Sequence, residues 1–315
     1  MSDTKAHPMA GVDSFTPAMV ARMVAERGVV KANAPFVTTF VLGVLAGAFI
    51  ALGAVLSTVV ATGSTLGYGP TKVLSGLAFS LGLILVVIAG AELFTGNNLI
   101  TMSWVSGSTS MWRLLRNWAI VYVGNLVGAL SIVFMLSYAD WWRQADGALG
   151  GTALSIAVAK ASLPFGVVVF RGILANALVC LAVWLASAGR TVADKILAIT
   201  FPIAAFVAAG FEHSVANMYF LPMGLTLEGE TAAARAAGVS AADVASFDVG
   251  AVVVNIVAAT LGNVIGGAIL VGLVYWFVYL RPGVNASGTW RRDRAATTSP
   301  VSPAGHGVGD DGRRG

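Results

Sequence analysis

The sequence predicts an all-α membrane protein of six transmembrane helices, arranged as an inverted repeat of three spans each, with broken second and fifth helices. Of its 315 residues, 57% are hydrophobic and only 11% are charged, whereas a soluble domain carries about a quarter charged residues. A bilayer core of roughly 30 Å needs about 20 apolar residues per helix. Six such stretches lie near residues 35–60, 73–93, 117–138, 163–187, 197–220 and 250–280.

An internal repeat supports the division into two halves. The segment 90–97 and the segment 210–217 share Gly, Glu and Asn at identical spacing. A second echo, Gly-Asn-x-x-Gly, follows each of them at 124–128 and 262–266, in the next predicted span. A half with an odd number of spans returns the chain to the opposite side of the membrane, so the two repeats must be inverted.

The positive charges fall mostly on one side of the predicted spans. Cytoplasmic loops of membrane proteins carry an excess of Lys and Arg, and most of the 19 Lys and Arg residues lie on the side of the N-terminus. The outer loops keep only Lys72, Arg143, Lys160 and Arg235. We therefore expect both termini to be cytoplasmic.

Three regions follow from this pattern: a cytoplasmic segment 1–34, a transmembrane domain 35–281 and a disordered cytoplasmic tail 282–315 rich in Gly, Ser, Pro and Arg. Residues 14–31 predict an amphipathic helix capped at Ser14 or Thr16 and closed at Gly28, with an apolar stripe of Val20, Met23, Val24 and Val30. We favour a helix lying against the membrane domain over an arm that binds a partner. In the loop 221–249 we expect one short helix, after Ser240.

Two glutamates fall where helices should be near the middle of the bilayer. A carboxylate there costs roughly 2.5–3.5 kcal/mol on insertion scales, and non-helical backbone at that depth survives only inside protein or along a cavity. We expect Glu92 and Glu212 to hold helix breaks together by accepting hydrogen bonds from freed backbone N–H groups, with Asn97 and Asn217 in the same structural role. A direct role of the glutamates in transport is the less favoured alternative.

His213 is the only histidine within a predicted span. An isolated buried histidine is usually a packing residue, but this one lies inside a predicted break, beside a carboxylate. We therefore favour a pore residue that donates a hydrogen bond or a proton. Cys180, the single cysteine, lies in an apolar run and is expected to be a packed core residue.

Enzymatic signatures are missing from the sequence. It holds no His-Glu-x-x-His, no Gly-x-Ser-x-Gly, no phosphate-binding glycine loop and no Cys/His set with metal-ligand spacing. We expect no catalytic residues, no metal, no cofactor and no nucleic-acid partner.

At three motifs the chain resembles the formate/nitrite transporter family, and the resemblance covers roughly residues 13–281. The motifs are the segments 91–97, 172–184 and 210–218, while the segment 79–85 is most like the formate-channel branch. The resemblance implies an aquaporin-like protomer with broken second and fifth helices, a homopentamer with one pore per protomer, and a bacterial inner (cytoplasmic) membrane. It also implies a flexible loop that includes Leu93, Phe94 and Thr95.

Positions matched to the family imply a pore with two hydrophobic constrictions. Phe79 and Phe206 would form the outer one. Leu83, Leu93 and Phe94 would form the inner one, with Val179 a possible neighbour. His213 would lie between them beside Asn176 and Thr95, and Lys160 would attract anions at the outer mouth. Two departures, the glycine at Gly96 and a cation at Arg171, leave the substrate branch open.

The function expected from these features is a channel or transporter for formate and related small monovalent weak-acid anions. Two hydrophobic rings oppose a bare anion, so formate would accept or share a proton at His213. Nitrite or hydrosulfide is the alternative substrate within the family. The sequence also leaves room for a neutral-solute pore of aquaporin type and for a regulated interaction protein acting through residues 14–31. Passive and proton-coupled flux, the direction of flux and a gating role of the N-terminal helix stay open.

Overall fold

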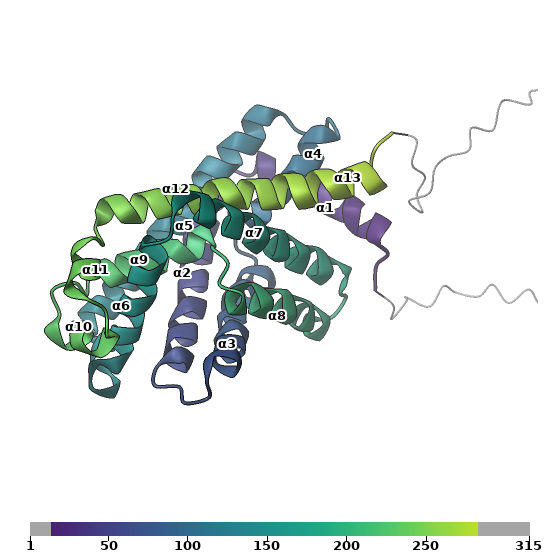
Figure 1. Cartoon of the computed structure of the whole chain (residues 1–315). Coiled ribbons are helices and arrows are strands. Elements are labelled where there is room, and N and C mark those ends of the chain that lie inside the picture. Colours follow the sequence, from purple (N-terminus) through teal and green to yellow (C-terminus); the bar gives the residue numbers. More distant parts are fainter. Residues whose placement is uncertain (1–13, 283–315) are drawn as a thin grey trace, which may run out of the picture.

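A computed structural model describes residues 14–282, and its regular structure in this range is entirely helical (Figure 1). Within residues 14–282, five helical runs are long and apolar enough to cross a membrane. They are α2 (Phe36–Ala61), α3 (Tyr68–Ala89), α5 (Met111–Tyr138), α7 (Phe165–Ala188) and a last run, Val249–Tyr279. The last run comprises α12 (Val249–Val264), a π-helical stretch (Ile265–Leu273) and α13 (Val274–Tyr279).

Shorter helices lie between and beside these runs. They are α1 (Pro17–Asn33), a 3₁₀ turn (Gly96–Ile100), α4 (Thr101–Val105), α6 (Ala148–Ala161), α8 (Val192–Ala208), α9 (Ser214–Leu225), α10 (Thr231–Ala237) and α11 (Ala241–Ala245). Two more 3₁₀ turns, Trp141–Arg143 and Ala145–Gly147, precede α6. The fifth apolar stretch of the sequence is therefore divided between α8, of 17 residues, and α9, of 12 residues, and both are shorter than the about 20 residues typical of a spanning helix.

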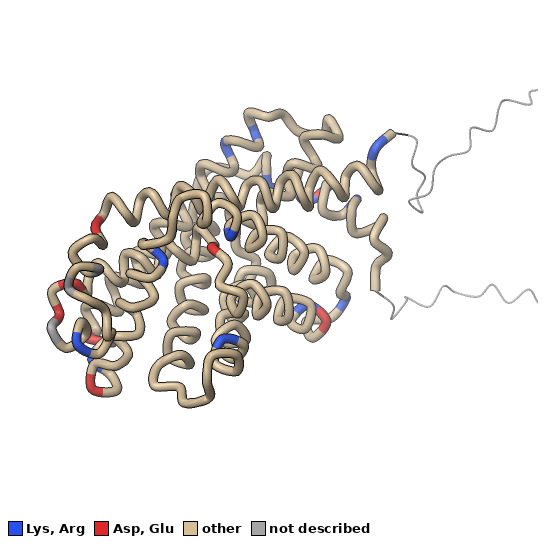
Figure 2. The backbone as a smooth tube through the Cα atoms, in the orientation of Figure 1, with Lys and Arg blue, Asp and Glu red and all other residues tan. Residues whose placement is uncertain are grey.

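The outer surface of the helices is apolar. Phe134, Phe170 and Phe201 are each about 70% exposed, and the tube between the two ends of the molecule carries few charges (Figure 2). Acidic residues gather instead at the end that holds α10 and α11 (Figure 2). Since large contiguous apolar surfaces are rare on soluble monomers, this surface fits contact with lipid or with other subunits.

Glycines let the main helix pairs approach closely, in the same way in both halves. Gly43 of α2 faces Gly124 of α5, and Gly172 of α7 faces Gly262 of α12, so that a Cβ at any of these positions would meet backbone atoms of the opposite helix. Small residues at helix contacts are how membrane helices pack closely. The pair α2–α5 is thus equivalent to the pair α7–α12, as the sequence repeat predicts.

The structure corrects three details of the N-terminal helix and the last loop. Gly28 does not close α1, because the helix runs on to Asn33 and Gly28 packs against Ser103. Val30 is 72% exposed and does not belong to the buried stripe, which consists of Ala18, Val20, Ala21, Val24, Gly28 and Ala32. The loop 221–249 carries two short helices, α10 and α11, instead of the one expected.

The start of α1 and the end of α13 lie at the same end of the molecule (Figure 1). There Val20 and Val24 of α1 share a buried cluster with Trp184 and Val271, and Tyr275 and Tyr279 pack against it. The tail predicted to be disordered lies outside the described residues, apart from its first position.

Candidate functional site

Two interruptions of regular helix define the centre of the molecule. After α3, Gly90 adopts a positive φ of 83°, and after α8, Gly210 adopts a positive φ of 70°. Glycine takes this left-handed conformation at no steric cost. Residues 91–95 then lead into the 3₁₀ turn before α4, and residues 211–213 lead into α9. We call these segments the first break and the second break.

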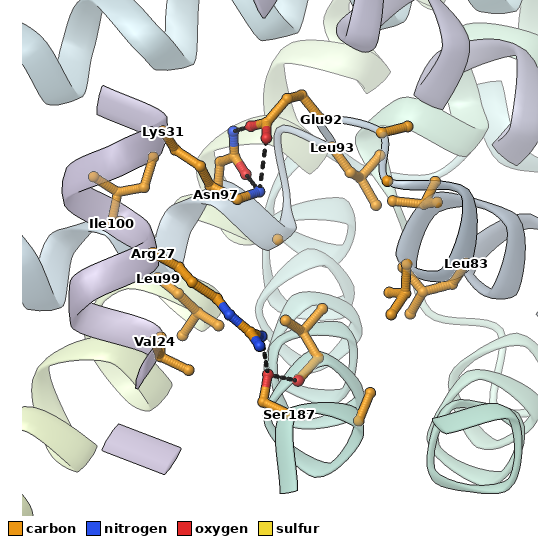
Figure 3. Close-up of a pocket in the computed structure, with 18 of the residues that line it drawn as sticks. Val24, Arg27, Lys31, Leu83, Glu92, Leu93, Asn97, Leu99, Ile100 and Ser187 are labelled. Atoms are coloured by element: carbon orange, nitrogen blue, oxygen red, sulfur yellow. Dashed lines mark hydrogen bonds and ion pairs between the residues drawn. The ribbon is translucent and has the colours of Figure 1, made fainter. Parts of the chain in front are cut away.

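The first break is held by a partly buried carboxylate. Glu92 Oε1 lies 3.1 Å from Lys31 Nζ of α1, and Glu92 Oε2 accepts a hydrogen bond of 2.6 Å from Asn97 Nδ2. Asn97 also donates to Asn117 Oδ1 of α5 at 2.9 Å, and Asn117 donates to the Lys31 carbonyl at 3.1 Å. Figure 3 shows Lys31, Asn97 and Glu92 converging between α1 and the break.

The second break repeats most of this arrangement. The difference is that Lys31 Nζ also donates to Asn97 Oδ1 at 2.8 Å, whereas Asn217 Oδ1 has no hydrogen-bond partner among the described residues. Glu212 accepts from Lys160 Nζ of α6 at 2.9 and 3.0 Å and from Asn217 Nδ2 at 2.7 Å. Asn217 also donates to Asn255 Oδ1 of α12 at 2.7 Å, and Asn255 donates to the Lys160 carbonyl at 2.8 Å. Helices α1 and α6 are therefore equivalent elements of the repeat, each supplying one lysine.

A second asparagine from the following span holds the backbone of each break. Asn125 Oδ1 accepts from the Phe94 N–H at 2.9 Å, and its Nδ2 donates to the carbonyls of Gly43 and Glu92. Asn263 Oδ1 accepts from the Ser214 N–H at 2.8 Å, and its Nδ2 donates to the carbonyls of Gly172 and Glu212. The expectation that the two glutamate carboxylates accept from freed backbone N–H groups is wrong. Their hydrogen bonds come from lysine and asparagine side chains.

The two breaks meet at Thr95 and His213. Thr95 Oγ1 lies 2.9 Å from His213 Nε2, and both residues are at most 2% exposed. His213 is also the N-cap of α9, because its Nδ1 accepts from the Ala216 N–H at 3.1 Å. A nitrogen that accepts carries no proton. The hydrogen bonds thus fit the neutral tautomer with the proton on Nε2, which donates to Thr95 and leaves the threonine hydroxyl proton for another acceptor.

One cavity lies beside each break; His213 lines one of them, and Thr95 lines neither. The α6 cavity, of about 340 Å³, is lined by Phe79, Phe206 and His213. The α1 cavity, of about 320 Å³, is lined by Leu83 and Leu93 (Figure 3). Phe79 and Leu83 are one turn apart on α3, so only about 6 Å along that helix separates the two linings.

Each cavity is lined by three cations and one carboxylate. They are Arg27, Lys31, Lys195 and Glu92 in the α1 cavity, and Lys72, Lys160, Arg171 and Glu212 in the α6 cavity. Because Lys31 and Lys160 are ion-paired with the glutamates, the net positive charge rests on the other cations. Arg27 donates to Ser187 Oγ at 3.3 Å (Figure 3), and Arg171 donates to the Gly210 carbonyl at 3.4 Å.

The structure places the remaining expected pore residues as follows. Phe79 and Phe206 contact edge to face at 5.5 Å between ring centroids. Phe94 packs edge to face on Tyr122 at 4.9 Å and lines neither cavity. Val179 is 1% exposed and also lines neither. Asn176 lies behind the pair, where its Nδ2 has the carbonyls of Thr95 and Asn263 and Asn98 Oδ1 within 3.3 Å.

The sequence interpretation did not assign Lys31, Asn117 or Asn255 to the site. Asn117 and Asn255 have a signal in the repeat that could have found them: each precedes by eight positions the asparagine of the second echo, Asn125 or Asn263. Likewise, Lys31 and Lys160 each stand five positions before a phenylalanine that begins a long helix.

The long apolar helices, the two breaks and the charged cavities define a helical membrane protein of the transport class. A sequence profile described as formate/nitrite transporter matches residues 18–277. The chain is 41% identical over 273 residues to the formate channel FocA of Escherichia coli (strain K12), which covers 85% of this chain and 96% of that protein. It is 39% identical over 264 residues to the formate channel FocA of Haemophilus influenzae, covering 82% and 93%. The chain therefore belongs to the formate/nitrite transporter family.

Solved structures agree with this membership. A pentameric formate channel with formate bound is 40% identical, with a TM-score of 0.72, and the match covers 78% of this chain and 98% of that one. An ion channel of the same family is 29% identical, with a TM-score of 0.68, covering 82% and 98%. The proteins that resemble this chain are named as channels or transporters.

Proposed function

We propose that this protein is a membrane channel or transporter for formate and related small monovalent weak-acid anions. The observation that carries the proposal is the Thr95–His213 hydrogen bond where the two breaks meet, with a cavity beside each break that is lined by more cations than carboxylates. The formate channels among its relatives, at 41 and 39% identity, favour formate over nitrite or hydrosulfide as the first substrate.

The proposed architecture has six spans, of which the second combines α3 with the first break and α4, and the fifth combines α8 with the second break and α9. Lys and Arg at the end that holds α1 and α13 favour a cytoplasmic location for that end, in a bacterial inner membrane. Residues 1–34, 35–281 and 282–315 then form the N-terminal segment, the channel domain and the tail. The solved pentameric relative supports a homopentamer with one pore in each protomer.

In this proposal an anion first enters a cavity whose unpaired cations raise its local concentration. Next it meets apolar side chains, Phe79 and Phe206 on one side and Leu83 and Leu93 on the other. A bare anion loses hydration there without compensation, so a hydrogen-bond donor between the rings lowers the barrier. His213 Nε2 and the Thr95 hydroxyl are the donors in place, and formate passes while sharing a proton with them.

Competitive uptake by the purified protein in liposomes tests the function. Labelled formate should enter, and unlabelled formate should compete better than nitrite or hydrosulfide. Uptake of nitrite or hydrosulfide with no formate flux would contradict the assignment. Imposing a pH gradient and then a membrane potential separates proton-coupled entry, which follows the pH gradient, from passage of the bare anion, which follows the potential.

A further inference from the structure

A buried polar chain lies behind the Thr95–His213 pair and connects the two breaks a second time. Asn98, one residue after Asn97, donates to the Phe94 carbonyl of the first break at 3.2 Å. Its Oδ1 accepts from Asn176 Nδ2 at 2.9 Å. Asn176 Nδ2 also lies 2.7 Å from the carbonyl of Asn263, the residue that holds the second break.

This chain is fully buried, so its hydrogen bonds have no competition from water. Asn98, Asn176 and Asn263 are each 0% exposed. A buried polar group without a partner costs about 1–3 kcal/mol, and each of these amides has its partners in the other two or in the backbone of a break. Loss of one member therefore leaves buried groups unsatisfied on both sides.

The π-helical stretch of the last run closes the pocket around these side chains. Gly267 lies in that stretch, and a Cβ there would meet Asn176 Nδ2, Asn98 Cβ and Cys180 Sγ. The wider turn and the missing side chain thus let the backbone press directly on the amide pair. π-Helical turns inside α-helices are frequent at functional sites.

This chain of buried asparagines has no counterpart at the equivalent positions of the repeat. By the spacing of the two halves, Asn98 corresponds to Met218 and Asn176 corresponds to Gly47. The equivalent place in the other half therefore has no amide pair, although the Lys–Glu–Asn frame is the same in both. The two additional asparagines, Asn98 and Asn176, contact the backbone of residues 93–95 in the first break.

We propose that Asn98 is a positioning residue that fixes Thr95 against His213, acting through Asn176 and the Phe94 carbonyl. Asn98 touches neither cavity and does not meet the anion. Its side chain holds the Phe94 carbonyl directly and acts on the Thr95 carbonyl through Asn176, and so sets the position of the Thr95 hydroxyl. The consequence for transport rests on the function proposed above, whereas the placement of residues 93–95 does not.

The single cysteine supplies a test that does not depend on transport. Cys180 is 0% exposed and its Sγ lies 3.4 Å from the Thr95 carbonyl. In Asn98→Leu, loosening of the first break should make Cys180 react severalfold faster with a small membrane-permeant maleimide. Thr101→Val is the matched control, because the Thr101 hydroxyl is buried on the following helix and has no hydrogen-bond partner among the described residues. It should leave the labelling rate unchanged.

The second readout is formate flux in liposomes. Asn98→Leu should lower it about three- to tenfold, the effect of one or two lost hydrogen bonds, and should change its pH profile. The effect should shrink in a Thr95→Val background, because residues that act through one another are not additive. Asn98→Ala serves if the leucine variant fails to assemble.

Unchanged Cys180 labelling and unchanged flux in an assembled Asn98 variant would overturn the proposal, as would full additivity with Thr95→Val. If the unaltered protein carries no formate, the proposed function is wrong and Cys180 labelling alone decides the role of Asn98.

Discussion

The two breaks share a frame, the lysine, glutamate and asparagines that hold each of them, and differ in the side chain at one position. Each has a lysine, a glutamate and two asparagines joined in the same order, with a further asparagine on the backbone. At the position where the first break has Leu93, the second has His213. The frame is the same in both halves because it satisfies the polar groups of irregular backbone, which would otherwise lack hydrogen-bond partners in a membrane. In the function proposed above, the variable position serves transport.

The largest expected difference concerns the two Lys–Glu pairs. Breaking a buried ion pair costs about 3–5 kcal/mol, because one charge is left without a partner. Lys160→Met should approach this loss, since the Lys160 and Glu212 side chains are 19% and 3% exposed. Lys31→Met should cost less, because Lys31 is 34% exposed. The thermal stability of the purified oligomer measures both.

The matched control is Lys160→Met combined with Glu212→Gln, which removes the charge of the partner as well. It should recover much of the stability lost by Lys160→Met. Equal losses of thermal stability in Lys31→Met and Lys160→Met would show that the difference in burial does not change the contribution of the two ion pairs.

The next effect isolates the chemistry of the second break. His213→Asn keeps an N-cap for α9, because asparagine accepts from the first-turn N–H groups as well as other caps do. It removes the ring nitrogen that faces Thr95, so formate flux should fall about tenfold or more, the worth of a hydrogen bond to a charged group. Liposome uptake between pH 5 and 8 checks the rate and its pH dependence.

His213→Phe removes the cap as well as the donor and should lower both flux and stability. Flux in His213→Asn that keeps the rate and pH dependence of the unaltered protein would show that the imidazole of the second break takes no part in transport.

A smaller effect is expected at the first break. Leu93→Ala widens the apolar lining of the α1 cavity without adding a charge. We expect formate flux to rise severalfold and the preference for formate over acetate to narrow, because Leu93 excludes by size. Uptake of both anions by the same vesicles measures this. A loss of flux with unchanged preference would assign Leu93 to the frame rather than to the constriction.

The smallest effect concerns the cations. Lys160 is neutralised by Glu212, so Arg171 should contribute more of the field in the α6 cavity. Arg171→Gln should raise the KM for formate about two- to fivefold at low salt and less at high salt, as for a screened charge. Arg171→Lys keeps the charge and should stay close to the unaltered protein. A salt-independent change would indicate a packing role.

The sequence repeat made the glutamates and asparagines of the two breaks predictable. The lysines that pair with the glutamates could not be predicted in this way. Spacing alone placed Glu92, Glu212 and the asparagines at the breaks, and placed His213 beside a carboxylate. Lys31 lies in α1, which the sequence predicts to lie outside the membrane-spanning helices. Its contact with Glu92 depends on how α1 packs against those helices. Residues 148–161 are mostly small and apolar, so no strong period marks α6 as the equivalent of α1.

The direction of individual side chains was also beyond the sequence. Phe94 is apolar and lies in the first break, as a constriction residue should, yet the structure packs it on Tyr122 because Asn125 holds its backbone N–H from the side of α5. The partners of the glutamates were mistaken for a similar reason. Freed N–H groups near a carboxylate suggested a direct bond, but the N–H groups of Phe94 and Ser214 donate to Asn125 and Asn263 of the next long helix.

The origin of those asparagines has a consequence for biosynthesis. Asn125 comes from the span that follows the first break, and Asn263 comes from the span that follows the second. During synthesis the chain emerges in order, so neither break can satisfy its backbone groups until the next span has been made. Each interrupted helix should therefore wait in the insertion machinery and enter the bilayer together with its successor, and the second half should finish only when the last helix arrives.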